Sequence, residues 1–432
     1  MKIVVVADHA YITGGQSKVA IESAVGLAGR GHNVTFFAAV GPVDPRLASA
    51  GIEVVCLEQG DIKTSSKASF LVQTLWNRKA EQALGAFMAA CDPADTVVHV
   101  HAWAKALSPS IGAALKRSNL ARVYTMHEFF MACPNGGFYD YQRTQTCHRK
   151  PMSLSCVTTN CDAVSYPRKL VRVARQLLVE AGGVKSAFPH IITISQLQDD
   201  AIRPYMPVDT IWHRVSNPIE AIDRGPKASP GRDFVFVGRL SPEKGVAHFC
   251  EAARRAGVTP VIIGDGPQKA ELERLYPEAN FLGWKSPSQV GELLRDARAL
   301  VFPSVWYEGQ PLTVYEALAA GTPVIVSDGC AGREAIRDGE NGLWFRSADA
   351  ESLAGALRRL SDPVEASRMT AAAYRDYWAS PLSLARHLDA IETVYRAALG
   401  DNVSLTQKVS GGAVLVSASD ETRIRPAARG AA

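Results

Sequence analysis

The clearest indication of the fold comes from residues 302–317, which read Phe302-Pro303-Ser304-Val305-Trp306-Tyr307-Glu308-Gly309-Gln310-Pro311-Leu312-Thr313-Val314-Tyr315-Glu316-Ala317. An apolar strand ends at Phe302, a loop follows, and Pro311 is well suited to the first position of a helix. Gly321 and Pro323 mark the end of that helix, before the apolar strand 324–326. A strand, a helix and a second apolar strand in this order are typical of a parallel sheet.

The same alternation extends through most of the chain. Strands are expected at 2–7, 33–38, 97–100, 124–126 and 190–194, and, after a linker at 215–231, at 234–237, 260–263, 299–302 and 323–327. Helical patterns lie between them. We therefore predict an α/β protein with two doubly wound, Rossmann-like parallel-sheet domains that face a central cleft, where such sheets bind ligands.

The domain limits follow from this pattern. We expect an N-terminal domain at 1–215 with a Cys-rich insertion at 128–165, a C-terminal domain at 216–375, and a helix at 376–400 that packs back on the first domain. Residues 401–432 carry small and charged residues without periodicity, and we expect them to form a disordered tail.

Composition narrows the function classes. The formal charge of +4 is spread along 432 residues, which argues against a nucleic-acid-binding protein. No apolar run approaches the roughly 18 residues of a membrane-spanning helix, and residues 1–7 have the pattern of a buried strand rather than of a signal peptide. A cytoplasmic location is expected, with peripheral contact at the inner face of the membrane as an open alternative.

Two loops of the second domain carry the charges that suit a ligand. Glu308 and Glu316 flank a helix N-terminus, whose amides and dipole favour an anion such as a phosphate. Arg239 and Lys244 follow the strand 234–237 and offer a planar fork and a point charge, a suitable pair for a diphosphate. Solvated surface charges are the alternative for either loop alone. Both loops, however, follow strands of one sheet at its ligand-binding edge.

These residues also carry a family resemblance. Gly238-Arg239-Leu240-Ser241-Pro242-Glu243-Lys244-Gly245 resembles the G-R-L-x-x-x-K-G loop of family 4 retaining glycosyltransferases, and 308–316 is similar to their E-x7-E motif. The resemblance covers most of residues 1–400. It implies a GT-B fold in which the N-terminal domain binds the acceptor and the C-terminal domain binds a nucleotide sugar, such as a UDP- or GDP-sugar.

The resemblance also implies roles for individual residues. Arg239 and Lys244 would hold the donor diphosphate, Glu308 the hydroxyls of the sugar, and Glu316 the ribose. The loop of Gly309, Gln310, Pro311, Leu312 and Thr313 would line the sugar and phosphate, and the segments that contain Gly264, Gly266 and Leu282 match the region around the nucleobase. Gln310 stands where the family often has Phe, so the resemblance does not define the sugar pocket, although it still implies the reaction.

Two motifs of the first domain complete the set. Gly14 and Gly15 resemble the family's glycine loop near the donor phosphate, although a simple turn would also explain them. Residues 124–128, Tyr-Thr-Met-His-Glu, are similar to the T-x-H-[DE] segment whose histidine lies beside the transferred sugar. We therefore interpret His127 as a hydrogen-bonding site residue rather than a general base, with an ordinary buried histidine as the alternative.

The expected activity is that of a hexosyltransferase. It would move a sugar from a nucleotide-diphosphate donor to a glycan or lipid-linked acceptor, in polysaccharide or glycoconjugate synthesis, and the resemblance alone implies that the transfer occurs with retention. No Asp-x-Asp segment lies in a loop placed to hold Mg²⁺, so Arg, Lys and the helix terminus would replace a catalytic metal. The alternatives are a non-catalytic glycosyltransferase-like partner subunit, or other GT-B chemistry such as a nucleotide-sugar epimerase or a phosphorylase.

Two further features lie outside the motifs. Cys133, Cys147, Cys156 and Cys161 could close a structural zinc site, with a redox switch or four packed thiols as alternatives. Basic residues at Arg168, Lys169, Arg172 and Arg175 alternate with leucine and valine on an expected helix. Such a helix could rest on anionic lipid headgroups, although a solvated face with a buried side is the alternative.

Overall fold

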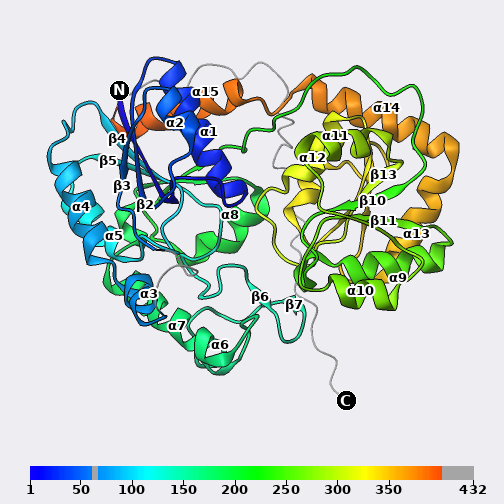
Figure 1. Cartoon of the computed structure of the whole chain (residues 1–432), viewed down its shortest axis with the longest axis horizontal. Coiled ribbons are helices and arrows are strands. Elements are labelled where there is room, and N and C mark those ends of the chain that lie inside the picture. Colours follow the sequence, from blue (N-terminus) through cyan, green and yellow to red (C-terminus); the bar gives the residue numbers. More distant parts are fainter. Residues whose placement is uncertain (61–66, 401–432) are drawn as a thin grey trace.

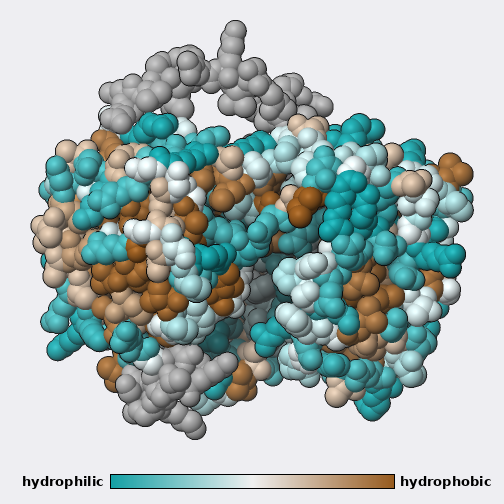
Figure 2. Space-filling model, turned by 45° about the horizontal axis from the view of Figure 1, so that its top comes forward, coloured by the Kyte–Doolittle hydropathy of each residue, from teal (hydrophilic) through white to brown (hydrophobic). Residues whose placement is uncertain are grey.

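The computed structural model describes residues 1–60 and 67–400, and the predicted tail at 401–432 lies outside these described residues. The chain forms two lobes side by side, each built around a parallel sheet with helices against its faces (Figure 1). In the space-filling view a furrow separates the lobes (Figure 2). The prediction of two doubly wound parallel-sheet domains is confirmed.

The N-terminal lobe has a sheet of seven described strands in the order β3-β2-β1-β4-β5-β8-β9, and all the pairings between them are parallel. The strands are β1 (Lys2–His9), β2 (Asn33–Val40), β3 (Glu53–Cys56), β4 (Thr96–Val100), β5 (Ala121–Thr125), β8 (His190–Thr193) and β9 (Ile211–Arg214). The helices are α1 (Gly15–Gly29), α2 (Pro45–Ser49), α3 (Lys67–Leu75), α4 (Arg78–Ala89), α5 (Ser110–Arg117), α7 (Tyr166–Ala181) and α8 (Gln196–Ile202), with 3-10 turns at Lys185–Ala187 and Arg203–Tyr205.

The C-terminal lobe repeats the arrangement with six described strands in the order β12-β11-β10-β13-β14-β15. The strands are β10 (Phe234–Val237), β11 (Pro260–Ile263), β12 (Asn280–Gly283), β13 (Ala299–Phe302), β14 (Val324–Ser327) and β15 (Gly342–Phe345). The helices are α9 (Val246–Ala256), α10 (Lys269–Leu275), α11 (Pro287–Asp296), α12 (Leu312–Ala319), α13 (Ala350–Ser361) and α14 (Pro363–Ala379), with 3-10 turns at Pro242–Lys244 and Ala331–Ala335.

Both sheets reverse their strand order at one point. In the first sheet this switch lies between β1 and β4, and in the second between β10 and β13, where Phe234 pairs with Ala299. The connections leave these neighbouring strands toward opposite faces of the sheet, which opens a crevice at their carboxyl ends. The loops after β1, β10 and β13, which carry Gly14, Gly15, Arg239, Lys244 and Glu308, start at these positions.

The central strands are buried because helices cover both faces of each sheet. Residues 3–6 of β1 have no exposed surface, as the continuous apolar run in the sequence predicts. The strands that the sequence did not predict, β3, β9, β12 and β15, are all sheet edges. Several predicted strands are also four residues long, but β3, β9 and β12 have no buried residue, so exposed polar positions interrupt the apolar run that marks the central strands.

The chain crosses between the lobes twice. After β9 it enters the second lobe, and after α14 it returns as α15 (Leu384–Ala398), which lies against α1 in the N-terminal lobe (Figure 1). Leu388, Ile391 and Tyr395 of α15 are buried in the core beneath α1. The predicted boundary at residue 375 falls inside α14, so the crossing itself lies between Ala379 and Leu384.

The Cys-rich insertion forms a small unit between the lobes. It contains the antiparallel hairpin β6 (Tyr139–Asp140) and β7 (Gln145–Thr146) and the short helix α6 (Leu154–Thr158). The Thr146 hydroxyl donates a hydrogen bond of 2.9 Å to the carbonyl of Val305 in the second lobe. Within the described residues, none of the helices is both long enough and apolar enough to span a bilayer.

Candidate functional site

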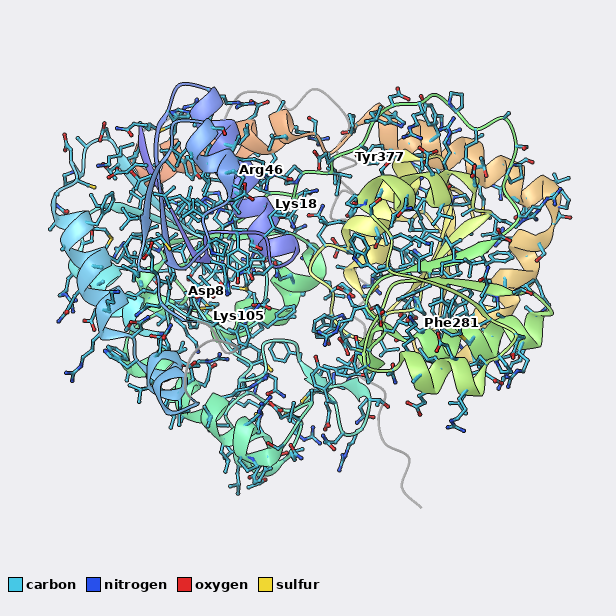
Figure 3. All side chains as sticks on the ribbon, in the orientation of Figure 1. Asp8, Lys18, Arg46, Lys105, Phe281 and Tyr377 are labelled. Atoms are coloured by element: carbon cyan, nitrogen blue, oxygen red, sulfur yellow. The ribbon has the colours of Figure 1, made fainter. Side chains whose placement is uncertain are left out.

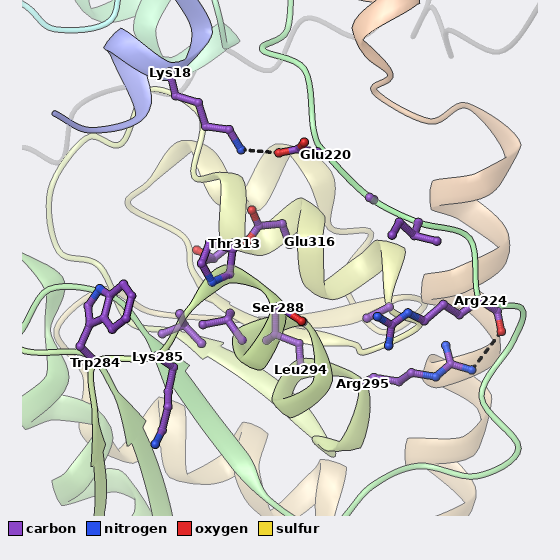
Figure 4. Close-up of a pocket in the computed structure, with 17 residues that line it drawn as sticks. Lys18, Glu220, Arg224, Trp284, Lys285, Ser288, Leu294, Arg295, Thr313 and Glu316 are labelled. Atoms are coloured by element: carbon purple, nitrogen blue, oxygen red, sulfur yellow. Dashed lines mark hydrogen bonds and ion pairs between the residues drawn. The ribbon is translucent and has the colours of Figure 1, made fainter. Parts of the chain in front are cut away.

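A cavity of about 550 Å³ lies beside α11 and α12 and faces the N-terminal lobe (Figure 4). Its floor includes Val237, Val290 and Leu294, and its polar wall includes Thr313 and Glu316 of α12. Trp284, whose side chain is 72% exposed, stands at one end with Lys285. An apolar floor with a few polar groups and this volume suits a nucleoside-sized ligand.

Lys18 of α1 reaches across to the cavity from the N-terminal lobe. Its Nζ lies 2.9 Å from Oε2 of Glu220, a residue of the linker, and both residues line the cavity. Figure 3 shows Lys18 on the side of α1 that faces the second lobe. The cavity is therefore shared between the two lobes.

The N-termini of α1 and α12 meet beside this cavity. A Cβ added at Gly15, the first residue of α1, would lie 3.9 Å from Cδ1 of Leu312, the first residue of α12. Pro311 caps α12 rather than occupying its first helical position, because its ψ of 106° is extended. The first amides of each helix have no partner within the helix, and the two dipoles together favour an anion in this space.

Lys244 and Glu308 form an ion pair next to these helix ends, in which Glu308 is buried and Lys244 is half-buried. Lys244 Nζ lies 2.6 Å from Oε1 of Glu308, and the Ser304 hydroxyl donates to the same oxygen at 2.7 Å. Burial by itself would raise the pKa of Glu308, but the charge and hydrogen bond of Lys244 outweigh it, so the pKa of Glu308 is lowered. Glu308 is therefore an ionised carboxylate at neutral pH.

The loops that carry this pair are packed directly against each other. Gly245 has a φ of 69°, and a Cβ at this position would come within 2.1 Å of the Pro303 carbonyl oxygen. The amide of Val305 donates to the carbonyl of Glu243 at 2.9 Å. Gly245, the last residue of the predicted G-R-L-x-x-x-K-G loop, thus allows the loops after β10 and β13 to touch. This contact brings Lys244 to Glu308.

Gly264 is also required for close packing. It has a φ of 138°, and a Cβ there would lie 1.9 Å from the carbonyl oxygen of Gly238. Gly266 follows in the same loop, where the backbone runs close to Leu240. Leu282 is half-buried against the lobe's core. Trp284, two residues after Leu282, lines the cavity with its side chain.

Arg239, in the loop after β10, is exposed, and within residues 1–60 and 67–400 no carboxylate forms a salt bridge with it. Burial raises the pKa of Tyr141, in the insertion, to about 12. The charges of Arg172 and Arg239 oppose this rise. The exposed guanidinium of Arg239 is therefore available to a ligand.

Two of the predicted loop residues hold the lobes together. The amide of Asn217 in the linker donates to Oε1 of Gln310 at 2.6 Å, and Nε2 of Gln310 donates back to the Asn217 carbonyl at 3.3 Å. A Cβ on Gly309 would lie 2.8 Å from Cδ1 of Ile194 in the N-terminal lobe. The side chain of Gln310 is thus bound to the linker, a role that the sequence did not indicate.

His127 lies at the carboxyl end of β5 and is partly exposed. Its Nε2 is 3.3 Å from Nδ1 of His101, which follows β4 and is fully buried. Burial, with a smaller contribution from His387, lowers the pKa of His127 to about 3, so the ring is neutral at neutral pH. Sequence analysis missed His101, although it also follows a strand of the same sheet directly.

No sequence pattern of this kind points to Lys18 and Glu220. Lys18 is one charged residue on a helix, and Glu220 is one charge in a linker. They become part of the site only because the lobes bring α1 and the linker to the same cavity.

The predicted zinc site is not supported. Across the described ranges 1–60 and 67–400, no group of three or more His, Cys, Asp or Glu side chains is placed to hold a metal ion, and all eight cysteines are free. The buried ammonium of Lys169 lies 3.1 Å from Sγ of Cys161 and 3.7 Å from Sγ of Cys156. A cation already occupies the space between these two sulfurs, and it would repel a metal ion. Cys133 is buried nearby, and Cys147 accepts from Arg149.

The prediction that the basic residues of α7 form an outward-facing side of the helix is wrong in part. Lys169 and Arg175 are buried, and Arg175 donates to the carbonyls of Ala104 and Pro134 and stacks on Phe130. Arg172 is partly buried and pairs with Asp162. These side chains tie α7 to the insertion, so Arg168 is the exposed cation of the four.

The chain is similar to known glycosyltransferases. Residues 219–376 match the family model described as glycosyl transferases group 1, so the chain contains that domain. Glycogen synthase of Mycobacterium tuberculosis is 35% identical over 162 residues, which cover 35% of this chain and 39% of that protein. D-inositol 3-phosphate glycosyltransferase of Acidothermus cellulolyticus is 28% identical over 345 residues, which cover 73% of this chain and 70% of that protein.

The solved structures include HepE of Anabaena in complex with UDP. It matches with a TM-score of 0.62 and 15% identity over 92% of this chain and 100% of that one. This likeness shows that the chain has the GT-B fold. The matched segment spans about two fifths of the length of the first relative, the glycogen synthase.

The ion pair of Lys244 and Glu308 gives a testable prediction for stability. Lys244→Met leaves a buried carboxylate without its cation, and we expect a loss of about 3 kcal/mol in the free energy of unfolding of the C-terminal lobe in urea. Lys244→Met with Glu308→Gln removes both charges and should recover much of that loss. Because the pKa of Glu308 is lowered in the fold, the pair's contribution is full above about pH 4.3 and disappears as the pH falls through the folded value.

The control for this experiment is Lys18→Met, which breaks an exposed pair and should cost about 1 kcal/mol or less. Equal destabilisation in the single and double variants would contradict the assignment of a coupled, buried pair.

Proposed function

We propose that this protein is a family 4 retaining glycosyltransferase that transfers a hexose from a nucleotide-diphosphate donor to a glycan or lipid-linked acceptor without a catalytic metal. One observation carries the proposal. The N-termini of α1 and α12 lie next to each other, and a nucleoside-sized cavity lined by Thr313 and Glu316 lies beside α12. Lys244 and Arg239 belong to the loop after β10, which packs against the loop that leads to α12. This arrangement suits a nucleoside diphosphate, with its phosphates at the helix ends.

The cavity residues suggest how the donor binds. Glu316 would accept hydrogen bonds from the ribose hydroxyls, and Trp284 would stack on the base. Burial raises the pKa of Glu316, so its carboxylate is less well solvated than an ordinary surface group and gains most from such hydroxyl donors. HepE of Anabaena binds UDP, which supports a UDP-sugar as the first donor to try.

The chemistry follows from where charge develops. Cleavage of the bond between the anomeric carbon and the phosphate oxygen leaves positive character on the sugar and negative charge on the departing diphosphate. Lys244, Arg239 and the α1 and α12 N-termini would stabilise that negative charge as fixed, preorganised groups, which is why no metal is invoked. Glu308, held by Lys244 and Ser304, would contact the sugar hydroxyls. Retention rests on the E-x7-E resemblance.

The N-terminal lobe offers a polar surface for the acceptor. Asp8, at the end of β1, accepts from the amides of Lys105, Ala106 and Leu107 at 2.8–3.0 Å and so fixes the loop after β4. Beside it, Lys105 is exposed and Glu128, which directly follows His127, is half-buried, with Nζ and Oε1 3.7 Å apart. Such groups suit a polyhydroxylated acceptor.

Acceptor-dependent release of nucleotide tests this function. A transferase frees UDP or GDP from a nucleotide sugar rapidly only when a saccharide acceptor is present, whereas a non-catalytic subunit binds without turnover and an epimerase converts the donor alone. Arg239→Ala should lower kcat by about 10²–10³-fold, as expected for loss of one transition-state charge partner.

The matched control is Arg254→Ala, which removes an exposed arginine of α9 that pairs with Glu278 away from the crevice. Full activity of Arg239→Ala, or donor conversion without acceptor, would overturn the proposal.

Contact with an anionic membrane is a second part of the proposal. Leu170 and Leu177 lie on one side of α7 and are 43% and 59% exposed, and Arg168 is exposed beside them. We expect the protein to float with vesicles of phosphatidylcholine and phosphatidylglycerol, and Leu170→Glu with Leu177→Glu to abolish flotation. Leu275→Glu, on the other lobe, is the control. No flotation of the unmodified protein would exclude this contact.

A further inference from the structure

Three histidines at the ends of neighbouring strands form a row that leads into the crevice. His99 and His101 belong to the end of β4 and His127 follows β5. The rings of His99 and His101 have centroids 4.1 Å apart, and those of His101 and His127 are stacked at 5.6 Å. His101 and His127 are joined by the 3.3 Å contact between Nδ1 and Nε2.

His101 is held firmly in place. The amide of His101 donates to the carbonyl of Val6 at 2.9 Å. The carbonyl of His101 accepts from Nε2 of Gln16 at 2.6 Å. His99 packs against its ring and is itself fixed by the hydroxyls of Tyr395, at 2.6 Å, and Thr125, at 2.7 Å. The ring of His101 therefore presents Nδ1 to His127 from a rigid position.

The proton in the contact can belong to either ring. Burial lowers the pKa of both histidines, so each ring is neutral and carries one N–H. If His127 donated from Nε2, the proton of His101 would sit on its own Nε2. That atom is buried and has no hydrogen-bond partner among the described residues. A buried N–H without an acceptor is rarer and costlier than a bare lone pair, so His101 donates from Nδ1.

We propose that His101 is a positioning residue that donates Nδ1–H to Nε2 of His127 and thereby fixes the proton of His127 on Nδ1. In this tautomer Nε2 of His127 is already engaged, and Nδ1–H is the group it can donate to a bound oxygen, such as a sugar hydroxyl. His127 then acts as a hydrogen-bond donor and not as a base. The catalytic consequence rests on the proposed function, but the tautomer does not.

The tautomer can be read directly by NMR of the full-length protein labelled with ¹⁵N in its histidine rings, with His127→Gln to assign the signals. We expect His127 to carry its proton on Nδ1. In His101→Phe this preference should be lost in favour of the Nε2–H form. In His101→Asn it should be kept, because the amide nitrogen stands near the position of Nδ1 and can donate.

A matched control uses a second histidine pair in the same sheet. His190 Nδ1 and His213 Nε2 are 3.0 Å apart on β8 and β9, with stacked rings 5.3 Å apart. His190→Asn should leave the signals of His127 unchanged. Thermal unfolding of each variant shows whether it is folded, and the spectrum of the unmodified protein decides the question even if His101→Phe does not fold.

The proposal is overturned if His127 carries its proton on Nε2 in the unmodified protein, or if a folded His101→Phe leaves the tautomer unchanged. In turnover, we expect His101→Phe to lower kcat about 10-fold to 100-fold with little change in the donor KM, and His101→Asn to restore most of it. If sugar transfer is absent while the tautomer is as stated, the proposed function fails and the positioning role stands.

Discussion

The ion pair between Lys244 and Glu308 is the interaction on which the candidate site depends. It joins two loops that leave adjacent strands at the point where the second sheet reverses its order. Without a ligand, the cation suited to a diphosphate and the carboxylate suited to a sugar neutralise each other, which compensates for their burial. A donor would enter between groups that are already in place, with the α1 and α12 N-termini on either side.

The N-terminal lobe and the insertion support these loops. Tyr307, next to Glu308, packs against Phe129 and Phe138, with ring centroids 6.2 and 6.3 Å away. On the opposite side of the loop, Glu334 of the second lobe accepts from the amides of Gln196 and Leu197 at the start of α8, at 2.9 and 2.8 Å. The insertion with its cysteines therefore acts as a packed support between the lobes, and Lys169 takes the position that a metal ion would need.

Sequence analysis predicted the central strands because strands buried on both faces are continuous apolar runs, as in residues 3–6. It missed the edge strands, where exposed polar positions interrupt the apolar run, and it placed Pro311 one position too far into the helix. The charged loops could be predicted because Arg239, Lys244, Glu308 and Glu316 follow strands of one sheet.

The remaining site residues depend on how the lobes meet. Lys18, Glu220 and the bond between Gln310 and Asn217 are contacts between segments far apart in the chain, and periodicity carries no information about them. The same holds for α7, where Arg175 turns inward because Ala104, after β4, and Pro134, in the insertion, supply carbonyl acceptors for it.

The most direct test of this account is a crystal structure of the protein with UDP bound. The account predicts that the diphosphate lies between the first amides of α1 and α12, with Lys244 and Arg239 on its oxygens and the ribose against Glu316. A diphosphate that lies away from both helix ends, with Lys244 still bound to Glu308 alone, would contradict it.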